Sequence, residues 1–313
     1  MNNEEFLFSQ KYRPKTVSEC ILPKRLKDLF QSYVNDRQVP NLLLYSGSGM
    51  GKTTTARAIC EEIGLDYLII NGSDENGVDT VRNKITNYAS SMSLKGGKKV
   101  IIIDEMEYMS LNAQAILRHA TEEFSHNCTF IFTCNYPSKI IEPLHSRCAV
   151  IDFSLKANEK PEMAALFFDR VKHILKIESI EYDAKVIVEI IKKYFPDYRR
   201  VLNELQRYSK FGKIDTGILS DLTDESVKEL IKHIASKDFT AMRKWVGIHG
   251  LDASNIYRQI YDQLSATMEA DSVPAAVMIL GDYMYKSAFC SDQEINLAAC
   301  CTELMVECSF LDK

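Results

Sequence analysis

Short apolar runs alternate with helical stretches along the first half of the chain. We expect strands at roughly residues 42–46, 66–70, 100–104, 129–133 and 149–153. The run around 100–104 is unbroken rather than alternating, which is typical of a strand that is buried on both faces. Strands that alternate with helices predict an α/β fold, in which a parallel five-stranded sheet has helices on both faces.

The strand pattern ends near residue 154, and helical periodicity takes its place at 163–168 and 186–191. From residue 220 onward every segment predicts helix. The pattern therefore divides the chain into three units: a core at 1–154, a small helical domain at 155–219 and an all-helical domain at 220–313.

The last of these units should hold several helices of ordinary length. We expect them at 227–235, 256–268, 275–285 and 295–308. Glycine and proline weaken a helix interior, so Gly247, Gly250 and Pro274 should lie at breaks between helices.

A glycine-rich loop lies between the first strand and the helix that follows it. Glycines let backbone N–H groups surround the β- and γ-phosphates of a nucleotide, and the helix N-terminus favours anions. Lys52 can reach the terminal phosphates, and the Thr53 hydroxyl can complete a Mg²⁺ shell. The usual motif has glycine where this chain has Ser46. The loop predicts nucleoside triphosphate binding by Ser46, Gly47, Ser48, Gly49, Met50, Gly51, Lys52, Thr53 and Thr54.

A buried strand at 99–103 runs into two carboxylates, Asp104 and Glu105. Ligands of parallel sheets bind at the carboxyl ends of the strands. Asp104 is placed to orient Mg²⁺, and Glu105 is placed to polarise the water that attacks the γ-phosphate. The alternative is a strand that merely ends in solvated acids, and the phosphate loop upstream argues against it.

Polar residues also follow the next two predicted strands. If the strand that ends at Cys134 neighbours the Asp104 strand, Asn135 would lie beside the γ-phosphate and could hold the attacking water. A strand-ending Asn is more often a turn residue. Arg147 stands just before the last strand, where a guanidinium could stabilise charge on a transferring phosphoryl group. It could equally be an ordinary surface arginine.

Composition favours a cytoplasmic protein with reduced, mostly buried thiols. The chain has 313 residues, of which 46% are hydrophobic. No apolar run reaches the ~20 residues of a membrane span, and the polar, acidic start predicts no signal peptide. The nine cysteines form no C-x-x-C pair and the six histidines are scattered, so we expect neither a zinc site nor a disulfide framework.

The net charge of −5 by itself argues against a nucleic-acid partner. The charge is unevenly distributed, however, because residues 220–313 carry −7 and residues 1–219 carry +2. The first two units could therefore meet a phosphate backbone locally.

These motifs together resemble one family. Their order and spacing are similar to those of sliding-clamp-loader ATPase subunits of the AAA+ class. Finer features resemble the large subunit of T4-type bacteriophage loaders, including Glu19–Pro23 and the Asn-Gly-Ser-Asp sequence. The similarity covers about residues 10–220, and beyond that only helical character and length agree. The motifs are Gln10–Pro14, the phosphate loop, Asn71–Asp74, Asp104–Glu105, Asn135, Ser146–Cys148 and Phe195–Arg200.

The resemblance implies a role for each matching residue. Lys52 and Thr53 would hold phosphate and Mg²⁺, and Asp104 and Glu105 would serve the metal and the water. Asn135 would sense the γ-phosphate of ATP.

Further matching residues would bind the nucleotide from outside the core. Residues 155–219 would form a lid, and Arg199, on one of its helices, would reach the phosphates of its own subunit. Arg147 would act in trans, in the site of the adjacent subunit. The adenine and ribose side would be formed by Tyr12, Arg13 and Pro14.

The resemblance also implies partners. Several copies of this subunit and one smaller subunit would form an open five-member ring, with residues 220–313 as its collar. A sliding clamp and primer–template DNA would bind this ring, in the host-cell cytoplasm if a phage encodes the chain.

Helices that begin near 77–79 and 111–114 would point their N-terminal amides at DNA phosphates. Arg82 and Arg118 are candidate DNA contacts, and so is Asn76, which stands where relatives tend to have a basic residue. The side chains of Tyr88, Met92 and Leu94 would meet the clamp or pack in the core.

Two alternatives remain at the level of sequence. A branch-migration helicase also combines such a core with a helical lid, but it should carry a C-terminal winged helix that 220–313 does not suggest. A catalytically inactive scaffold subunit of the same ring should lack the lysine or the carboxylates, and this chain has both.

Overall fold

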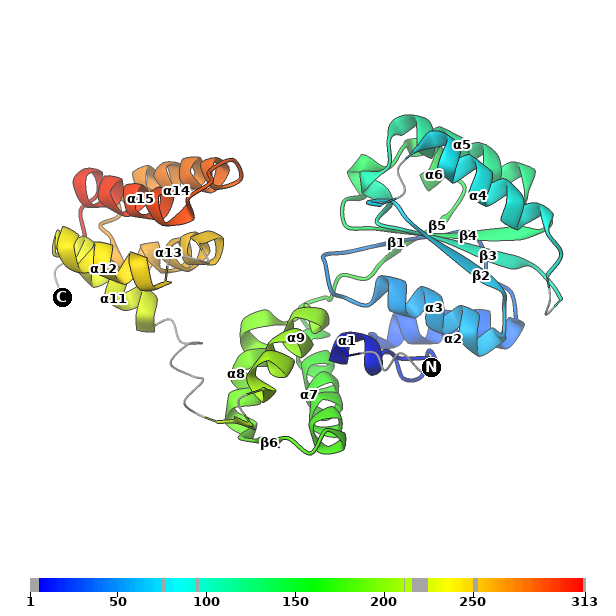
Figure 1. Ribbon diagram of the computed structural model, residues 1–313, viewed down its shortest axis with the longest axis horizontal. Coiled ribbons are helices and arrows are strands. Elements are labelled where there is room, and N and C mark those ends of the chain that lie inside the picture. Colours follow the sequence, from blue (N-terminus) through cyan, green and yellow to red (C-terminus); the bar gives the residue numbers. More distant parts are fainter. Residues whose placement is uncertain are drawn as a thin grey trace. The chain divides into compact units, whose positions relative to one another are not determined.

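The computed structural model describes residues 6–74, 77–93, 96–210, 212–215, 225–249 and 253–311. The chain divides into two compact units, residues 1–215 and 216–313. Figure 1 shows the elements of each unit. None of the described helices is long and apolar enough to cross a membrane.

The first unit contains the expected parallel sheet of five strands in the order β2-β3-β4-β1-β5. The predicted strands are confirmed, and no strand end differs from its predicted position by more than one residue. The strands are β1 Leu42–Tyr45, β2 Tyr67–Asn71, β3 Lys99–Asp104, β4 Cys128–Cys134 and β5 Ala149–Asp152.

Helices cover both faces of this sheet (Figure 1). Successive strand residues point to opposite faces, so each strand feeds two cores. Leu42 and Leu44 of β1 belong to one buried cluster, which includes residues of α2 and α3. Leu43 belongs to the other, which includes residues of α4 and α5. The helices are α2 Lys24–Asp36, α3 Lys52–Ile63, α4 Val78–Ser90 and α5 Leu111–Glu123.

The strand order brings the polar strand ends together. Because β4 lies between β1 and β3 and all three are parallel, their carboxyl ends meet at one edge. The expectation that the Asn135 strand neighbours the Asp104 strand is therefore confirmed. The short helices η1 Met106–Tyr108, η2 Pro137–Lys139 and α6 Glu142–His145 follow these strands.

A helical lid follows the sheet, formed by α7 Lys160–Ile177, α8 Ala184–Tyr194 and α9 Tyr198–Ser209. The expected helical lid is confirmed, and it also contains a small parallel pair of strands, β6 Glu181–Tyr182 and β7 Lys213–Ile214. Strands of two residues are too short to show a period in the sequence.

The N-terminal segment packs on the lid. Helix α1, Phe8–Lys11, lies against α9. The backbone N–H of Phe8 donates to Gln206 Oε1 at 3.0 Å, and Gln206 Nε2 donates to the Phe6 carbonyl at 2.7 Å. The segment that leads to Tyr12 is thereby fixed to the lid.

The second unit is all-helical over its described residues, as predicted. Its buried residues form one cluster drawn from all five helices. The helices are α11 Glu225–Ala235, α12 Phe239–His249, α13 Ala253–Thr267, α14 Val273–Ser287 and α15 Gln293–Glu307.

The breaks between these helices were only partly predicted. The expectation for Gly247 is wrong, because it lies inside α12, a helix that was not among the ranges predicted for this unit. Buried Met242, Trp245 and Val246 hold α12 in place despite the glycine. Pro274 lies in the first turn of α14 as expected, whereas Gly250 lies outside the described residues.

Candidate active site

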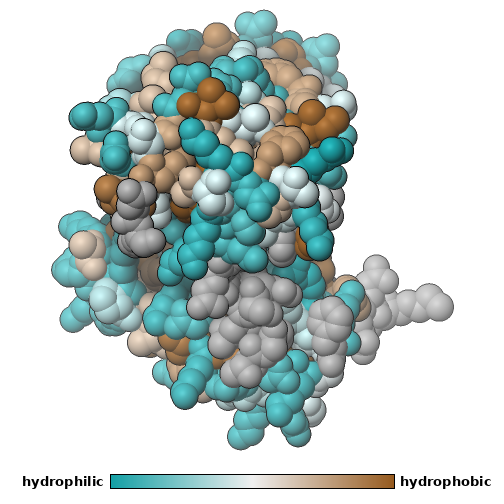
Figure 2. All heavy atoms as spheres, turned by 90° about the vertical axis from the view of Figure 1, so that its left-hand side faces the viewer, coloured by the Kyte–Doolittle hydropathy of each residue, from teal (hydrophilic) through white to brown (hydrophobic). Residues whose placement is uncertain are grey.

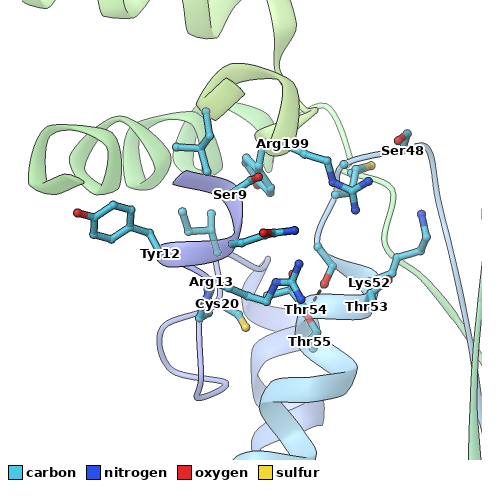
Figure 3. A pocket seen from close by; sticks show the side chains of 18 of the residues that line it. Ser9, Tyr12, Arg13, Cys20, Ser48, Lys52, Thr53, Thr54, Thr55 and Arg199 are labelled. Carbon is cyan, nitrogen blue, oxygen red and sulfur yellow. Dashed lines mark hydrogen bonds between the residues drawn. The ribbon is translucent and has the colours of Figure 1, made fainter. Parts of the chain in front are cut away.

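A pocket of about 400 Å³ lies where the phosphate loop, the N-terminal segment and the lid meet. Its phosphate half consists of the loop and the ends of β3 and β4. Its outer half is lined by residues from the segments 7–14 and 19–22 and from the lid helices α7 and α9. Figure 3 shows side chains from both halves directed into the same space.

Lys52 is the most constrained cation of the phosphate half. Only 7% of its surface is exposed. Its Nζ donates to the carbonyl oxygens of Ser46 and Gly47 at 2.9 and 2.8 Å and to Asn135 Oδ1 at 2.9 Å. Burial lowers the pKa of Lys52, and the charge of Glu107 is the largest influence that opposes this shift. Each of these acceptors can be exchanged for a phosphate oxygen.

Gly49 shows why the loop needs glycine. Its φ is +71°, a conformation that L side chains rarely adopt. A Cβ at this position would lie 1.7 Å from Asp197 Oδ1 on the lid. The Gly49 carbonyl also accepts the backbone N–H of Tyr198 at 3.2 Å, so the lid touches the loop directly.

Two hydroxyl groups converge on Asp104. Thr53 Oγ1 donates to Asp104 Oδ1 at 2.6 Å, and Thr133 Oγ1 donates to the same oxygen at 2.5 Å. Hydroxyl and carboxylate oxygens suit Mg²⁺. The described residues contain no group of three or more His, Cys, Asp or Glu side chains that could hold a metal ion.

The backbone conformation of Glu105 sets the direction of its side chain. Its φ is +54°, in the left-handed region, and it begins the turn η1. Its N–H donates to Thr133 Oγ1 at 3.2 Å. Gly72, on the neighbouring β2 side, comes so close that a Cβ there would lie 2.7 Å from the Glu105 carbonyl oxygen. The absence of a side chain at Gly72 thus permits the turn that directs Glu105 into the pocket.

Asn135 is held at both ends. Its side-chain oxygen accepts from Lys52, and its backbone N–H donates to Glu107 Oε1 at 2.9 Å. Both Asn135 and Lys52 line the pocket.

The lid contributes Arg199 at the start of α9. Asp197 caps this helix by accepting the backbone N–H of Arg200 at 2.9 Å. Arg199 extends from α9 toward the phosphate loop, and Arg13 extends toward it from the N-terminal segment (Figure 3).

Tyr12, Arg13 and Pro14, which the resemblance assigns to the adenine and ribose side, all line the outer half. The Tyr12 ring is turned away from the phosphate loop (Figure 3), and its hydroxyl donates to Glu178 Oε1 at 2.5 Å. Lys11 Nζ donates to the same oxygen at 2.8 Å, and Arg170 donates to the Tyr12 carbonyl at 3.2 Å. The N-terminal segment is thereby tied to the lid helix α7.

Several predicted site residues lie elsewhere among the described residues. Ser46 and Gly47 bind Lys52 without lining the pocket, and Arg147 does not line it either. Arg147 donates to Glu122 Oε1 at 2.5 and 2.8 Å and to the Pro143 carbonyl at 2.7 Å. These contacts lower the pKa of Glu122.

The predicted DNA contacts lie on other helices. Arg82 and Arg118 are exposed on α4 and α5, whose first residues, Val78 and Leu111, agree with the predicted helix starts. Asn76 lies outside the described residues, as does Leu94.

Sequence reasoning missed much of the outer half and two polar groups of the phosphate half. Phe167, Ile174 and Leu202 line the pocket but share the helical spacing of ordinary core residues. Thr133 and Glu107 carry no motif, and only the pairing of β3 with β4 reveals their partners. Residues 19–22, noted only as a family feature, also line the pocket.

A phosphate loop after β1, carboxylates after β3, a polar residue after β4 and a helical lid define an AAA+ ATPase. A model of the AAA family, ATPases associated with various cellular activities, matches residues 42–155. The model of the AAA+ lid domain of the sliding-clamp-loader large subunit matches residues 159–220.

Curated relatives narrow the class. The chain is 36% identical over 313 residues to the sliding-clamp-loader large subunit of Enterobacteria phage T4, covering 98% of each protein. It is 40% identical over 275 residues to that of Escherichia phage RB69, covering 85% of this chain and 86% of the relative. The replication factor C small subunit of Saccharolobus solfataricus is 32% identical, with 97% and 95% covered. The chain therefore belongs to the sliding-clamp-loader large-subunit family, and its expected identity as an AAA+ clamp-loader ATPase is confirmed.

Solved structures agree on the fold. The R170A mutant of Thermotoga maritima RuvB matches with a TM-score of 0.55 and 16% identity, over 82% of this chain and 88% of that one. At this identity the likeness extends to the fold alone.

Proposed function

We propose that this subunit uses ATP to open a sliding clamp and to load it onto primer–template DNA in the host cytoplasm. The observation that carries this proposal is the chain of contacts from Lys52 through Asn135 to the turn after β3. It ties the phosphate loop to the two strand ends that a γ-phosphate would touch, in a chain related to clamp loaders.

The phosphate half supplies the groups for hydrolysis. Thr53 and Asp104 would hold Mg²⁺, which neutralises phosphate charge when it is bound. Glu105 would accept a proton from the attacking water. Lys52 would exchange its carbonyl partners for phosphate oxygens, and Asn135 would then orient the γ-phosphate and the water.

The lid would report on the nucleotide. Arg199 lies in the first turn of α9, next to the residues that contact Gly49. Phosphate bound in the loop would attract Arg199 and fix the lid against the core. A ligand that favours one arrangement of the subunit in this way shifts the population toward it.

Arg147 would act on the nucleotide of a neighbouring subunit. It does not line the described pocket of its own chain, and its guanidinium is already oriented by Glu122 and the Pro143 carbonyl. A nucleotide site that needs an arginine from a neighbouring subunit is complete only in an oligomer. We propose a five-member ring of several copies of this subunit and one smaller subunit.

The C-terminal unit would form the collar of this ring, with the core at 1–154, the lid at 155–219 and the collar at 220–313. Helix α14 exposes Met278 and Tyr285 to the extent of 76% and 69%, and Phe289, just beyond its end, is 75% exposed. Figure 2 shows hydrophobic side chains scattered among hydrophilic ones on the face of the molecule turned to the viewer. The Tyr285 and Phe289 rings lie 5.2 Å apart, centroid to centroid, and adjacent exposed apolar side chains of this kind are suited to burial against a neighbouring subunit.

Helices α4 and α5 would meet DNA phosphates. Ser110 already caps α5 by accepting the Ala113 N–H at 3.2 Å, so earlier amides and the exposed Arg118 remain for a ligand. Arg82 is exposed on α4. Met92, which is 92% exposed beyond α4, would meet the clamp, whereas Tyr88 packs against the core.

Steady-state ATP hydrolysis by the subunit assembled with its smaller partner tests this proposal. We expect joint stimulation by primed DNA and clamp. Arg147→Lys should leave nucleotide binding nearly unchanged and lower the stimulated rate by about 10³-fold, because a planar donor becomes a point charge. The matched control is Arg37→Lys, at an exposed arginine remote from the pocket.

Three outcomes would contradict parts of the proposal. A rate that is coupled to duplex unwinding and indifferent to the clamp would indicate a motor of another kind. ATP binding without any hydrolysis would indicate a scaffold subunit. Loss of nucleotide binding in Arg147→Lys would contradict the role of Arg147 alone.

A further inference from the structure

Glu107 is a buried carboxylate beside the site, and none of the roles above uses it. It lies in the turn η1, two residues after Glu105, and only 6% of its surface is exposed. Burial of a charged group is costly unless hydrogen bonds or opposite charges compensate it. The neighbours of Glu107 therefore indicate its purpose.

One oxygen of Glu107 has a specific partner. Oε1 accepts the backbone N–H of Asn135 at 2.9 Å. Oε2 is buried and finds no hydrogen-bond partner among the described residues. Lys52 supplies a compensating charge: its Nζ lies 2.9 Å from Asn135 Oδ1, and the charge of Glu107 opposes the lowering of the Lys52 pKa by burial.

The sheet explains why Asn135 needs this partner. The register of β3 and β4 ends with Ile103 opposite Phe132, and Asn135 lies beyond the last residue of β4. Its N–H therefore extends past the ladder that β3 provides. The Glu107 side chain supplies the acceptor that a longer β3 would have supplied.

The same turn also carries Glu105. The Tyr108 N–H donates to the Glu105 carbonyl at 3.1 Å, and the Met109 N–H donates to the Met106 carbonyl at 3.0 Å. These backbone bonds fix Glu107 relative to Glu105. The turn thus sets the position of Asn135 and that of Glu105 together.

We infer that Glu107 is a positioning residue, which holds the Asn135 backbone so that its side-chain amide faces the γ-phosphate once Lys52 turns to the nucleotide. This inference rests on the proposed role of Asn135 as the γ-phosphate sensor. Glu107 touches neither nucleotide nor water in this account. It acts on the chemical step through Asn135 alone.

The test compares Glu107→Met and Glu107→Gln in the full-length subunit assembled with its partner. Methionine fills a similar volume but accepts no strong hydrogen bond, whereas the glutamine oxygen can still accept the Asn135 N–H. We expect Glu107→Met to lower kcat by about 100-fold, since a small misplacement of a catalytic group has this effect. Glu107→Gln should restore kcat to within about tenfold of wild type, because one neutral hydrogen bond replaces a charged one.

Nucleotide binding separates positioning from general damage. ADP lacks the γ-phosphate, so its affinity should stay within about threefold in both variants, while discrimination between ATPγS and ADP should fall in Glu107→Met. Glu204→Ala is the control, because it removes a mostly buried lid carboxylate that pairs with Arg207 at 2.7 Å and does not line the pocket. It should lower Tm without changing kcat.

Asn135→Ala and the double variant identify the route. If Glu107 acts through Asn135, the double variant should be no slower than Asn135→Ala. The inference would be overturned if the losses of kcat in the two single variants add in the double variant. Equal losses of ADP and ATPγS affinity in Glu107→Met would also overturn it. Should Glu107→Met not fold, Glu107→Ala takes its place in the same cycle.

The same cycle distinguishes failure of the inference from failure of the proposed function. A slow Asn135→Ala beside a fully active Glu107→Met would contradict the inference and leave the sensor role of Asn135 intact. A fully active Asn135→Ala would contradict that sensor role, and Glu107 could then not act through Asn135.

Discussion

The two halves of the nucleotide pocket are built in different ways. In the phosphate half, polar atoms bind one another: Lys52 contacts carbonyls and an amide, and Asp104 receives two hydroxyl groups. In the outer half, apolar side chains such as Phe167 and Leu202 come from segments far apart in the sequence.

The difference reflects what each half must do. A group that acts on a reacting phosphate must be placed within fractions of an ångström, so its residue type and backbone geometry are both constrained. The free energy of apolar contact with the adenine ring depends on the buried area, so many different side chains can provide it. Changes in the phosphate half should therefore lower turnover, and changes in the outer half should lower affinity.

The largest effect should follow Glu105→Gln. The amide keeps the shape of the side chain but cannot accept the proton of the attacking water, so kcat should fall by at least about 100-fold. Contacts made by Lys52 and Thr53 to phosphate and Mg²⁺ would remain, and ATP binding should persist. Single-turnover hydrolysis and equilibrium ATP binding measure the two quantities separately. Loss of ATP binding would contradict the role given to Glu105.

Gly72→Ala should give the next largest effect. The added Cβ would lie 2.7 Å from the Glu105 carbonyl oxygen, so the turn that carries Glu105 must move. We expect kcat to fall by about tenfold, with ATP affinity nearly unchanged, since only the position of Glu105 alters.

Gly77→Ala is the control for this variant. A Cβ at Gly77 would meet Thr80 Oγ1 at 3.4 Å, an ordinary contact. Its basal kcat should equal that of wild type. If Gly72→Ala instead weakens ATP and ADP binding with normal kcat, the division between the two halves does not hold at this edge.

In the outer half, Phe167→Leu should weaken ATP and ADP binding alike. Phe167 is 2% exposed, lines the pocket and lies 4.6 Å from the Tyr198 ring, centroid to centroid. Loss of about 1 kcal/mol of apolar contact corresponds to about fivefold in affinity. Phe168→Leu, on the same helix and outside the pocket lining, should change neither affinity. A fall in kcat with unchanged affinity would contradict the comparison.

The same division explains what the sequence could predict. The strands and the phosphate-half residues could be predicted because period, glycine loop and carboxylate pair each reflect a local constraint. Thr133 and Glu107 could not, because their partners Asp104 and Asn135 are 29 and 28 residues away and depend on strand register. Phe167 could not, because lining a pocket and filling a core require the same spacing. The interior position of Gly247 in α12 likewise depends on packing against the rest of its unit.

The smallest effect should come from the link between the N-terminal segment and the lid. Lys11 and Tyr12 both donate to Glu178, and these bonds, that of Lys11 first, hold the pKa of Glu178 below its usual value of 4.5. A carboxylate with a depressed folded pKa stabilises the fold above its unfolded pKa, and the contribution is lost as pH falls through the folded pKa. Exposed ion pairs of this kind contribute about 0.2–1 kcal/mol.

Glu178→Gln should therefore lower Tm by about 1–3 °C at pH 7, as expected for a loss of this size in a domain of about 200 residues. The difference from wild type should shrink as pH falls below about 4. Asp169→Asn removes an ion pair with Lys172 that joins two turns of α7 and no separate segments, so it should change Tm less. Because the Tyr12 carbonyl is also held by Arg170, kcat should not change in Glu178→Gln. A loss of turnover larger than the loss of affinity would mean that the outer half takes part in the chemical step.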